Sequence, residues 1–545
     1  FLIIPYSDLK DRSARTQQPQ QPTHPWLEPR RRGGDGQGPL GSIYEPLGTG
    51  CTNAWYVDWD CDDAGPAAQT TECRGNCGLT RQGMIGDKPD ADDEDPTIHS
   101  AASVHADPRY GNPATNFQRW KTLLDKKFGF PIGDVYFIAL NGNDATGQVN
   151  NANRPYRSLG AVLANNPSNS DVILYRQGRY YNPPPPNKCT APNIPDGPAA
   201  LALDKLHIPA GNPLVIASYP GEQVILEGSD AVGISNSENI LLDGFVITCG
   251  AQCRRDYCGK FWGGNRGIVP GNNDNVIIQN SEITAFNRGI HGSFYWGKTI
   301  FRKIVVHDNA IEHGIYTSAG TYDGTTYIQS DVTVEDSLLY RNRRTGYQNN
   351  GPAERLKLTR NIIHSNGGTG ITFVNGVQSS EVSNNLIFNN NQQGLLIWND
   401  NEDPSRLRPG RRGNNNNLIV NNLIWIGQYW NGVCNNGADN NNGAWVPCGN
   451  VDIPSSMNAI RFDDATPLKD FNFIGNEFRN NIIMTSQMPI FGSAYLIDVK
   501  NSKVENNIFY RTDTDVLNGL ISDRWAKPGD TDGTHDHEEN CPNCR

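Results

Sequence analysis

The sequence has no long apolar run, no excess of positive charge and no usable site for N-linked sugar. No stretch approaches the about 18 uninterrupted apolar residues of a membrane-spanning helix, so we expect no membrane insertion. Lys and Arg number 47 against 58 Asp and Glu, and a net charge of −11 argues against nucleic acid as a partner. The one Asn-x-Ser/Thr spelling begins at Asn166 and is blocked by Pro167, so N-glycosylation is not expected.

The residues that are abundant are those of tight turns. The chain holds 62 Asn, 56 Gly and 35 Pro, with only 19% charged residues. Asn and Gly tolerate the left-handed backbone conformation that such turns require. A chain so rich in both must reverse direction often.

The 12 cysteines favour an extracellular location. Most of them lie in Gly- and Asn-rich, loop-like sequence, and an even number placed this way predicts disulfides in an oxidising compartment. We expect Cys434 to pair with Cys448, and two of Cys249, Cys253 and Cys258 to pair locally. The apolar start, Phe1–Pro5, lacks the basic residues and long apolar core of a signal peptide, so a mature secreted form is expected.

Composition divides the chain into four parts. Residues 1–50 are low in complexity and predict an extended arm that cannot form a core alone. Residues 51–132 carry four Cys and one amphipathic stretch, Ala114–Phe128, which predicts a helix packed on the body. Residues 133–515 are repetitive, and residues 516–545 form an acidic tail.

The repetitive part consists of units of about 24 residues. Gly346, Gly370 and Gly394 are spaced by 24 residues, and similar units surround Gly289 and Gly314. Each unit contains short runs of alternating apolar residues with Asn or Gly at the corners. One unit cannot bury its apolar side, but a stack of units buries a continuous core with about 4.8 Å per coil. A leucine-rich repeat fold is not supported, because the leucine spacing of that fold is absent from these units.

The opening of this part, GDVYFIALNGNDATG followed by RPYRSLGAVLAN and SDVILYRQGRYY, resembles secreted right-handed parallel β-helix proteins of the pectate-lyase-like kind. The resemblance implies an all-β solenoid whose first rungs are followed by a short helix covering the open end of the coil. We therefore predict a single-stranded right-handed parallel β-helix of about ten coils. Asn361, Asn385 and Asn507 recur at one corner, with Asn309 expected to join them, and their amides are expected to hydrogen-bond along the column.

Aligning the strands that follow the corner glycines assigns each side chain to the inside or the outside of the solenoid. Five residues are expected to point inward, namely Ile290, Ile315, Tyr347, Ile371 and Leu395. The residue after each of these, and the residue two places beyond that one, are expected to point outward. Together they form a polar and aromatic face suited to a sugar polymer. From this face we predict ligand contacts by Tyr316, Gln348, Asn350 and Trp398.

Polysaccharide lyases with this fold abstract a proton beside a uronate carboxylate, with a Lys, Arg or His-Tyr base and a cation. The candidates by position are His291, His313, Tyr316, Lys357, Arg360 and His364. The acidic residues expected to converge with such a base are missing from the phased strands, and no pair of carboxylates suited to a glycosidase can be placed.

The C-terminal run from Asp530 to Pro542 resembles a thrombospondin type 3 calcium repeat, with Glu539 in place of its last Asp. The resemblance implies Ca²⁺ as a cofactor, bound by Asp530, Asp532, Asp536 and Glu539. The alternatives are an acidic tail that binds no ion and Zn²⁺ at His535, His537, Cys541 and Cys544.

Two function classes remain open. The first, favoured by the arm and the missing acid–base cluster, is an extracellular structural subunit that self-associates into a filament or surface layer. The second is a carbohydrate-active enzyme or a polysaccharide-binding protein that uses the outward face of the solenoid.

Overall fold

The computed structural model describes the β-helix and parts of the sequence before it. The described residues are 56–57, 84–85, 105, 109–181, 200–228, 230–249, 266–292, 297–309, 312–319, 321–322, 325–326, 328–399, 413–426, 433–434, 446–447, 459–464, 473–485, 491–493 and 501–511. The predicted arm, the predicted calcium ligands and most cysteines lie outside these ranges. The self-association, calcium and disulfide predictions therefore stay predictions.

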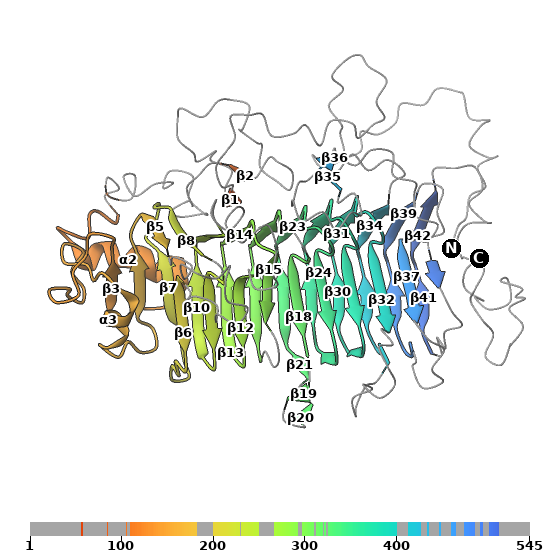
Figure 1. Ribbon diagram of the computed structural model, residues 1–545, viewed down its shortest axis with the longest axis horizontal. Coiled ribbons are helices and arrows are strands. Elements are labelled where there is room, and N and C mark those ends of the chain that lie inside the picture. Colours follow the sequence, from red (N-terminus) through yellow and green to blue (C-terminus); the bar gives the residue numbers. More distant parts are fainter. Residues whose placement is uncertain are drawn as a thin grey trace, which may run out of the picture. The chain divides into compact units, whose positions relative to one another are not determined.

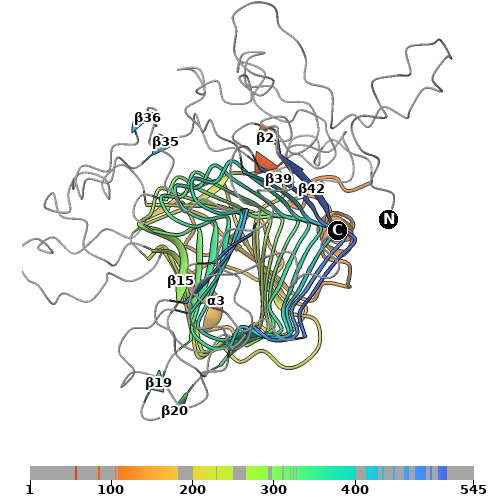
Figure 2. The same cartoon turned by 90° about the vertical axis from the view of Figure 1, so that its right-hand side faces the viewer.

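Three long parallel sheets form the three walls of the solenoid, which confirms the predicted parallel β-helix (Figures 1 and 2). Consecutive strands pass from one sheet to the next, and each strand pairs in parallel with the equivalent strand of the neighbouring coil. The sheets have 12, 11 and 10 strands and are called sheets I, II and III, which agrees with about ten coils.

Sheet I contains β3 (Val135–Ile138), β4 (Val172–Tyr175), β7 (Leu214–Ser218), β10 (Glu238–Asp243), β13 (Asp274–Gln279), β16 (Thr299–Arg302), β22 (Val332–Glu335), β26 (Lys357–Thr359), β30 (Glu381–Ser383), β33 (Leu418–Val420), β38 (Glu477–Arg479) and β41 (Lys503–Glu505). Sheet II contains β5 (Gly178–Tyr181), β8 (Val224–Glu227), β11 (Phe245–Thr248), β14 (Glu282–Thr284), β17 (Val305–His307), β23 (Leu338–Tyr340), β27 (Ile362–His364), β31 (Leu386–Phe388), β34 (Leu423–Ile426), β39 (Ile482–Thr485) and β42 (Ile508–Arg511).

Sheet III contains β6 (Leu201–Asp204), β9 (Val232–Ser235), β12 (Arg266–Gly271), β15 (Arg288–Gly292), β18 (Ile315–Ser318), β24 (Tyr347–Asn350), β28 (Ile371–Val374), β32 (Leu395–Asn399), β37 (Ile460–Asp464) and β40 (Phe491–Ser493). A small parallel sheet joins β21 (Gln329–Ser330), β25 (Ala353–Glu354) and β29 (Val377–Gln378). Three antiparallel pairs are formed by β1 (Tyr56–Val57) with β2 (Met84–Ile85), β19 (Thr321–Tyr322) with β20 (Thr325–Thr326), and β35 (Val433–Cys434) with β36 (Val446–Pro447).

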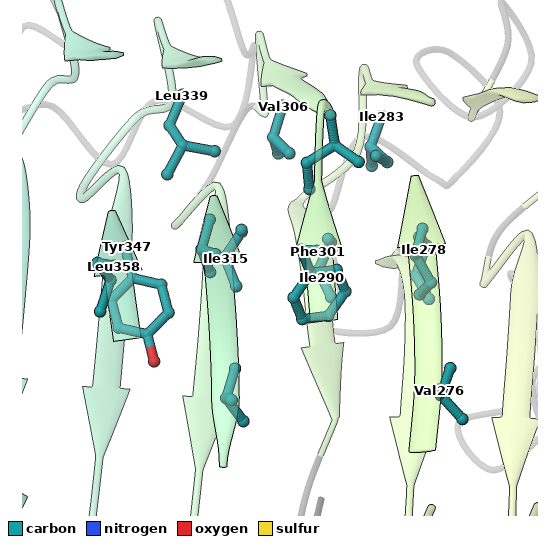
Figure 3. Close-up of a cluster of buried hydrophobic side chains, with 14 of the residues drawn as sticks. Val276, Ile278, Ile283, Ile290, Phe301, Val306, Ile315, Leu339, Tyr347 and Leu358 are labelled. Atoms are coloured by element: carbon teal, nitrogen blue, oxygen red, sulfur yellow. The ribbon is translucent and has the colours of Figure 1, made fainter. Parts of the chain in front are cut away.

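The inward side chains fill the coil, as the phasing predicts. Ile290, Ile315, Tyr347, Ile371 and Leu395 are all fully buried and lie opposite one another on successive strands of sheet III. Figure 3 shows Ile290, Ile315 and Tyr347 with inward residues of the other two sheets, such as Phe301 and Leu339. The core is therefore a stack of apolar layers, and alternation of side chains along each strand decides which residues enter it.

Two helices close off exposed apolar surface at the start of the coil. The predicted amphipathic helix is α2 (Phe117–Phe128), which Asn116 caps and Gly129 ends in the left-handed conformation. Its Trp120, Leu123 and Leu124 pack on the outer face of sheet I. The short helix α3 (Leu159–Leu163) places Val162 in the main core, so the predicted cover over the first coil is also present. Neither helix, nor any other helix among the described residues, is long and apolar enough to cross a membrane.

Asparagine ladders hold two corners of the coil. One ladder runs through Asn361, Asn385, Asn422, Asn481 and Asn507, each side-chain amide donating to the next at 2.9–3.0 Å. The predicted column is thus confirmed, but Asn309 is not part of it. Asn309 begins a second ladder at the corner between sheets II and III, which continues through Asn342, Asn366 and Asn390. The sequence pattern misplaced Asn309 because both corners follow a short apolar strand with Asn.

Candidate functional site

The outer face of sheet III brings three of the six predicted catalytic residues together. His291 on β15 and Tyr316 on β18 are direct neighbours in the strand register, and their rings stack with centroids 4.7 Å apart. His313, in the corner before β18, lies with its ring centroid 4.9 Å from that of Tyr316. Both histidines are nearly buried, with exposures of 8% and 4%, whereas Tyr316 is half-buried.

The other three candidates lie on different walls. Lys357 is an exposed outward residue of sheet I. Arg360 sits at the corner between sheets I and II and is held by ion pairs with Asp336 and Glu335. His364 stacks between Tyr340 and Phe388 on the outer face of sheet II. None of the three can act together with His291 and Tyr316, because the walls of a β-helix face in different directions.

Two acidic residues lie in corners beside the sheet III face, and each is paired with an arginine of that face. Arg288 makes two hydrogen bonds to the Glu312 carboxylate, at 2.5 and 2.6 Å, and a third contact of 3.2 Å to Nδ1 of His291. One coil earlier, Arg266 makes the same paired contact with Asp230, at 3.0 and 2.7 Å. The phasing missed both carboxylates because they lie in the corners and not on the strands.

A repeated tetrapeptide in the sequence identifies Arg266 and Arg288 as equivalent residues of neighbouring coils. The tetrapeptide Asn-Arg-Gly-Ile occurs twice, at 265–268 and 287–290, and the structure pairs Arg266 with Arg288 in register. Each arginine directly precedes a corner glycine. Close packing requires that glycine: a Cβ on Gly289 would meet the Gly314 carbonyl oxygen at 2.5 Å. A repeated basic residue beside an obligatory corner glycine thus marks one column of outward charge.

The site arginines and burial keep both imidazoles neutral. Burial, together with the charges of Arg288 and Arg266, lowers the pKa of His291 to about 3. Burial and the charges of Arg344 and Arg288 lower the pKa of His313 to about 3 as well. Burial alone would raise the pKa of Glu312, but its hydrogen bonds to Arg288 hold that pKa below its ordinary value.

Hydrogen bonds also decide which ring nitrogen of each neutral histidine carries the proton. A guanidinium can only donate, so Nδ1 of His291 accepts from Arg288 and its proton sits on Nε2. Nδ1 of His313 accepts from the backbone N–H of Thr345 at 3.3 Å, which places its proton on Nε2 in the same way. The two histidines therefore act as N–H donors through Nε2, not as bases.

All four predicted ligand-binding residues lie on the same face. Gln348 is the register partner of Tyr316, and Nδ2 of Asn350 donates to the Tyr316 hydroxyl oxygen at 2.9 Å. Trp398 lies further along, opposite Val374 in register. The neighbouring outward residues Thr372 and Val374 are almost completely buried, so the face is not uniformly open.

No metal centre is evident in this region. Within the described ranges, no group of three or more His, Cys, Asp or Glu side chains is placed to hold a metal ion. The predicted calcium ligands, Asp530, Asp532, Asp536 and Glu539, lie outside those ranges. Around Tyr316, the described side chains thus offer one phenol, two neutral imidazoles, three guanidinium groups and the two carboxylates that Arg266 and Arg288 engage.

Comparison with known proteins agrees with the fold. The family model for the right-handed β-helix region matches residues 227–406, which include the His291–Tyr316 pair. No curated protein sequence matches the chain.

Similar solved structures include a pectate lyase, a rhamnogalacturonan lyase and a mannuronan C-5 epimerase module. Pectate lyase Pel9A is 14% identical, with 72% of this chain and 78% of that chain covered and a TM-score of 0.35. A rhamnogalacturonan lyase is 14% identical, with 71% and 89% covered and a TM-score of 0.43. The A-module of the Azotobacter vinelandii mannuronan C-5 epimerase AlgE4 is 14% identical, with 65% and 89% covered and a TM-score of 0.36. These structures are similar to the chain in fold alone.

Proposed function

We propose that the outer face of sheet III binds an acidic polysaccharide and that Tyr316 transfers a proton at it. The observation that carries this proposal is the stacking of Tyr316 on the neutral His291, beside the guanidinium of Arg288. The reaction class is proton abstraction from the carbon next to a uronate carboxylate. In a lyase the bond from the adjacent carbon to the leaving sugar oxygen then breaks and a carbon–carbon double bond forms, while the proton taken up by Tyr316 passes to the leaving oxygen.

Local charge supports an acidic polymer. Around Tyr316, the face carries three guanidinium groups, from Arg266, Arg288 and Arg344, against the carboxylates of Asp230 and Glu312, and both histidines are neutral. Among these five charged groups positive charge exceeds negative charge by one, in a chain whose net charge is −11. A positive patch on an acidic protein attracts a polyanion to that patch and repels it elsewhere.

Each group has a defined part in the proposed reaction. Arg344 is exposed and close enough to influence both Glu312 and His313, so its guanidinium is available to a uronate carboxylate. Neutralising that carboxylate makes the neighbouring carbon acid stronger. The Nε2–H groups of His291 and His313 can donate to the charge that develops, and the Tyr316 phenolate is the base.

Glycoside hydrolysis fits the same residues poorly. It needs one carboxylic acid that is protonated near neutral pH and a second carboxylate that is free to act. Glu312 and Asp230 are both engaged by two guanidinium hydrogen bonds, and the pKa of Glu312 is lowered, not raised. Proton abstraction by Tyr316 is therefore favoured over acid-catalysed hydrolysis.

The length of the face supports a polymer as the ligand. Tyr316 and Trp398 lie on β18 and β32, which are separated by β24 and β28. Three strand spacings of about 4.8 Å span about 14 Å, which exceeds one sugar ring. An aromatic side chain at that distance can stack on a second sugar unit while the first is held at Tyr316.

The test is turnover of a panel of polymers by the full chain. Polygalacturonate and alginate are the acidic substrates and a neutral glucan is the control, with the ultraviolet absorbance of the unsaturated product as readout. We expect turnover of an acidic polymer only, and its loss in Tyr316→Phe. Tyr340→Phe is the matched control, because Tyr340 stacks on the outer face of sheet II and should leave turnover unchanged.

Two other outcomes would change the assignment. Saturable binding of an acidic polymer without product, weakened by Arg344→Gln, would identify a polysaccharide-binding protein. Absence of both binding and turnover across the panel would reject the proposal.

A further inference from the structure

A short relay of amide hydrogen bonds ends on the hydroxyl of Tyr316. Nδ2 of Asn375 donates to Oδ1 of Asn350 at 3.2 Å, and Nδ2 of Asn350 donates to the Tyr316 oxygen at 2.9 Å. Asn375 is only 3% exposed. The relay crosses two coils, since Asn350 ends β24 and Asn375 directly follows β28.

The relay has a fixed direction. An Asn side chain has one acceptor oxygen and one NH₂ donor, so the donation from Asn375 to Oδ1 turns the NH₂ of Asn350 toward Tyr316. The phenol oxygen then accepts, and its own proton is left for another partner. Successive donations in one direction polarise each amide and strengthen the last hydrogen bond.

Backbone geometry holds the first member of the relay in place. Asn375 has φ +64, in the left-handed region, which Asn and Gly adopt far more readily than other residues. Asn350 belongs to the strand ladder, where its register partners are Ser318 and Val374. Both amides are thus anchored by the fold and not by flexible loops.

We propose that Asn350 and Asn375 are positioning residues that keep the Tyr316 oxygen a hydrogen-bond acceptor and so stabilise its phenolate. A donor pointed at the oxygen stabilises the deprotonated form more than the neutral form. The catalytic use of this arrangement rests on the proposed function, whereas the direction of the relay does not depend on any substrate.

The first experiment needs no substrate. Tyrosine labelled with ¹³C at Cζ is incorporated into the full chain, and the Tyr316 signal is assigned by its absence in Tyr316→Phe. Asn350→Leu keeps a similar volume but removes the donor, so the ionisation midpoint of Tyr316 should rise by about 1–2 pH units. Asn375→Gly should raise the ionisation midpoint of Tyr316 by a smaller amount, and glycine tolerates the positive φ at this position.

A matched control distinguishes the effect of breaking the relay from the effect of removing any corner asparagine. Asn384 has φ +56 at another corner and an exposed side chain, so Asn384→Gly should leave the Tyr316 midpoint where it is in the unmodified chain. A thermal melt of each variant establishes that it is folded. An unchanged midpoint in folded Asn350→Leu would overturn the inference.

The second experiment distinguishes this inference from the proposed function. If Tyr316 is the base, the pH profile of kcat/KM should move upward in Asn350→Leu by the same amount as the midpoint. A merely structural role would lower the melting temperature without moving the profile.

The two ideas can fail separately. Turnover that survives in Tyr316→Phe would reject the proposed function. The titration of Tyr316 would still test whether the relay stabilises its phenolate. Loss of turnover in Tyr316→Phe, with neither midpoint nor profile moved in Asn350→Leu, would reject the relay alone.

Discussion

Nε2 of His307 lies 2.9 Å from Oε1 of Glu282, and Nδ1 of the same ring lies 2.7 Å from Oδ2 of Asp308. The His307 side chain is 8% exposed and that of Glu282 is 2% exposed, on the outer face of sheet II. Burial alone would lower the pKa of His307, but the two carboxylates raise it to about 9. The ring is therefore a buried imidazolium at neutral pH, stacked on Tyr340 with centroids 4.8 Å apart.

This cluster predicts how stability depends on pH. The folded pKa of His307 lies above its ordinary 6.5, so its contribution is fully present below about pH 6.5 and is lost as pH rises through about 9. The pKa of Asp308 is lowered by Arg341 and His307 against the effect of burial, so its contribution is lost as pH falls through acid values. Chemical denaturation across this range should show His307→Gln less stable by roughly 3 kcal/mol near pH 6, with the difference shrinking between about pH 6.5 and pH 9 and nearly absent above pH 9.

The control is a histidine in a similar pair at the surface. His207 contacts Glu238 at 3.3 Å, but its side chain is 63% exposed. His207→Gln should leave stability and its pH dependence unchanged, because exposed pairs contribute little. A parallel alkaline decline in the unmodified chain and His307→Gln would show that the cluster is not the cause.

The fold was predictable because it depends on a repeated local pattern. Gly346, Gly370 and Gly394 at a spacing of 24 fix the period, and alternation within each strand decides which side chains enter the core. These features lie within single units, so one sequence suffices to read them. The placement of Asn309 was wrong because two corners use the same residue type, and only the path of the coil distinguishes them.

The candidate site was only partly predictable, for a physical reason. Outward strand positions such as Tyr316, Gln348 and Asn350 follow from alternation, and the structure places them on one face. Glu312 and Asp230 occupy corners, where alternation breaks down and side-chain direction depends on backbone angles such as the φ +52 of Asp230. The relay from Asn375 likewise depends on a corner conformation that residue spacing does not reveal.

The corner glycines predict a large effect of a very small substitution. A Cβ on Gly370 would meet the Gly394 oxygen and Ile387 Cγ2 at 2.7 Å, and Nδ2 of Asn390 at 2.9 Å. Gly370→Ala should therefore destabilise the coil by about 1–3 kcal/mol through overpacking. Gly160→Ala, in helix α3, meets nothing within 4 Å and should instead stabilise slightly, by about 0.5–1 kcal/mol. Denaturant titration of both variants measures the contrast, and equal effects would contradict it.

The asparagine ladder predicts a pH-dependent defect. Nδ2 of Asn385 donates to the Leu358 carbonyl and to Oδ1 of Asn422, both at 2.9 Å. Asn385→Asp keeps the shape but turns an oxygen toward two oxygens, so it should cost about 3–5 kcal/mol at neutral pH. Burial raises the folded pKa of such a carboxyl, so the deficit should shrink as pH falls toward about 4.

An exposed neighbour provides the comparison for the ladder. Asn384→Asp makes the same chemical change at a residue with an exposed side chain. Its stability should match that of the unmodified chain at every pH tested. A similar deficit at both positions would mean that added negative charge, not the lost donor, is responsible.

The calcium-repeat-like run predicts a local effect of metal removal. If Asp530, Asp532 and Asp536 bind Ca²⁺ with Glu539, a chelator should speed proteolysis of the last twenty residues or so and leave the melting of the β-helix unchanged. Zn²⁺ bound by His535, His537, Cys541 and Cys544 would instead be restored by zinc but not by calcium. Identical proteolysis with and without chelator would contradict both.

The position of Trp398 predicts a loss of polymer affinity that is separate from the chemistry at Tyr316. Its half-buried ring lies on the outer face of sheet III, three strands from Tyr316, where it can stack on a second sugar unit. Trp398→Ala should weaken binding of the acidic polymer that the chain turns over by about 0.5–1.5 kcal/mol, roughly twofold to tenfold in KM, with kcat little changed. Trp425→Ala is the matched control, because Trp425 is also half-buried but faces outward from sheet II. Equal losses of affinity in the two variants would mean that the polymer does not follow the sheet III face.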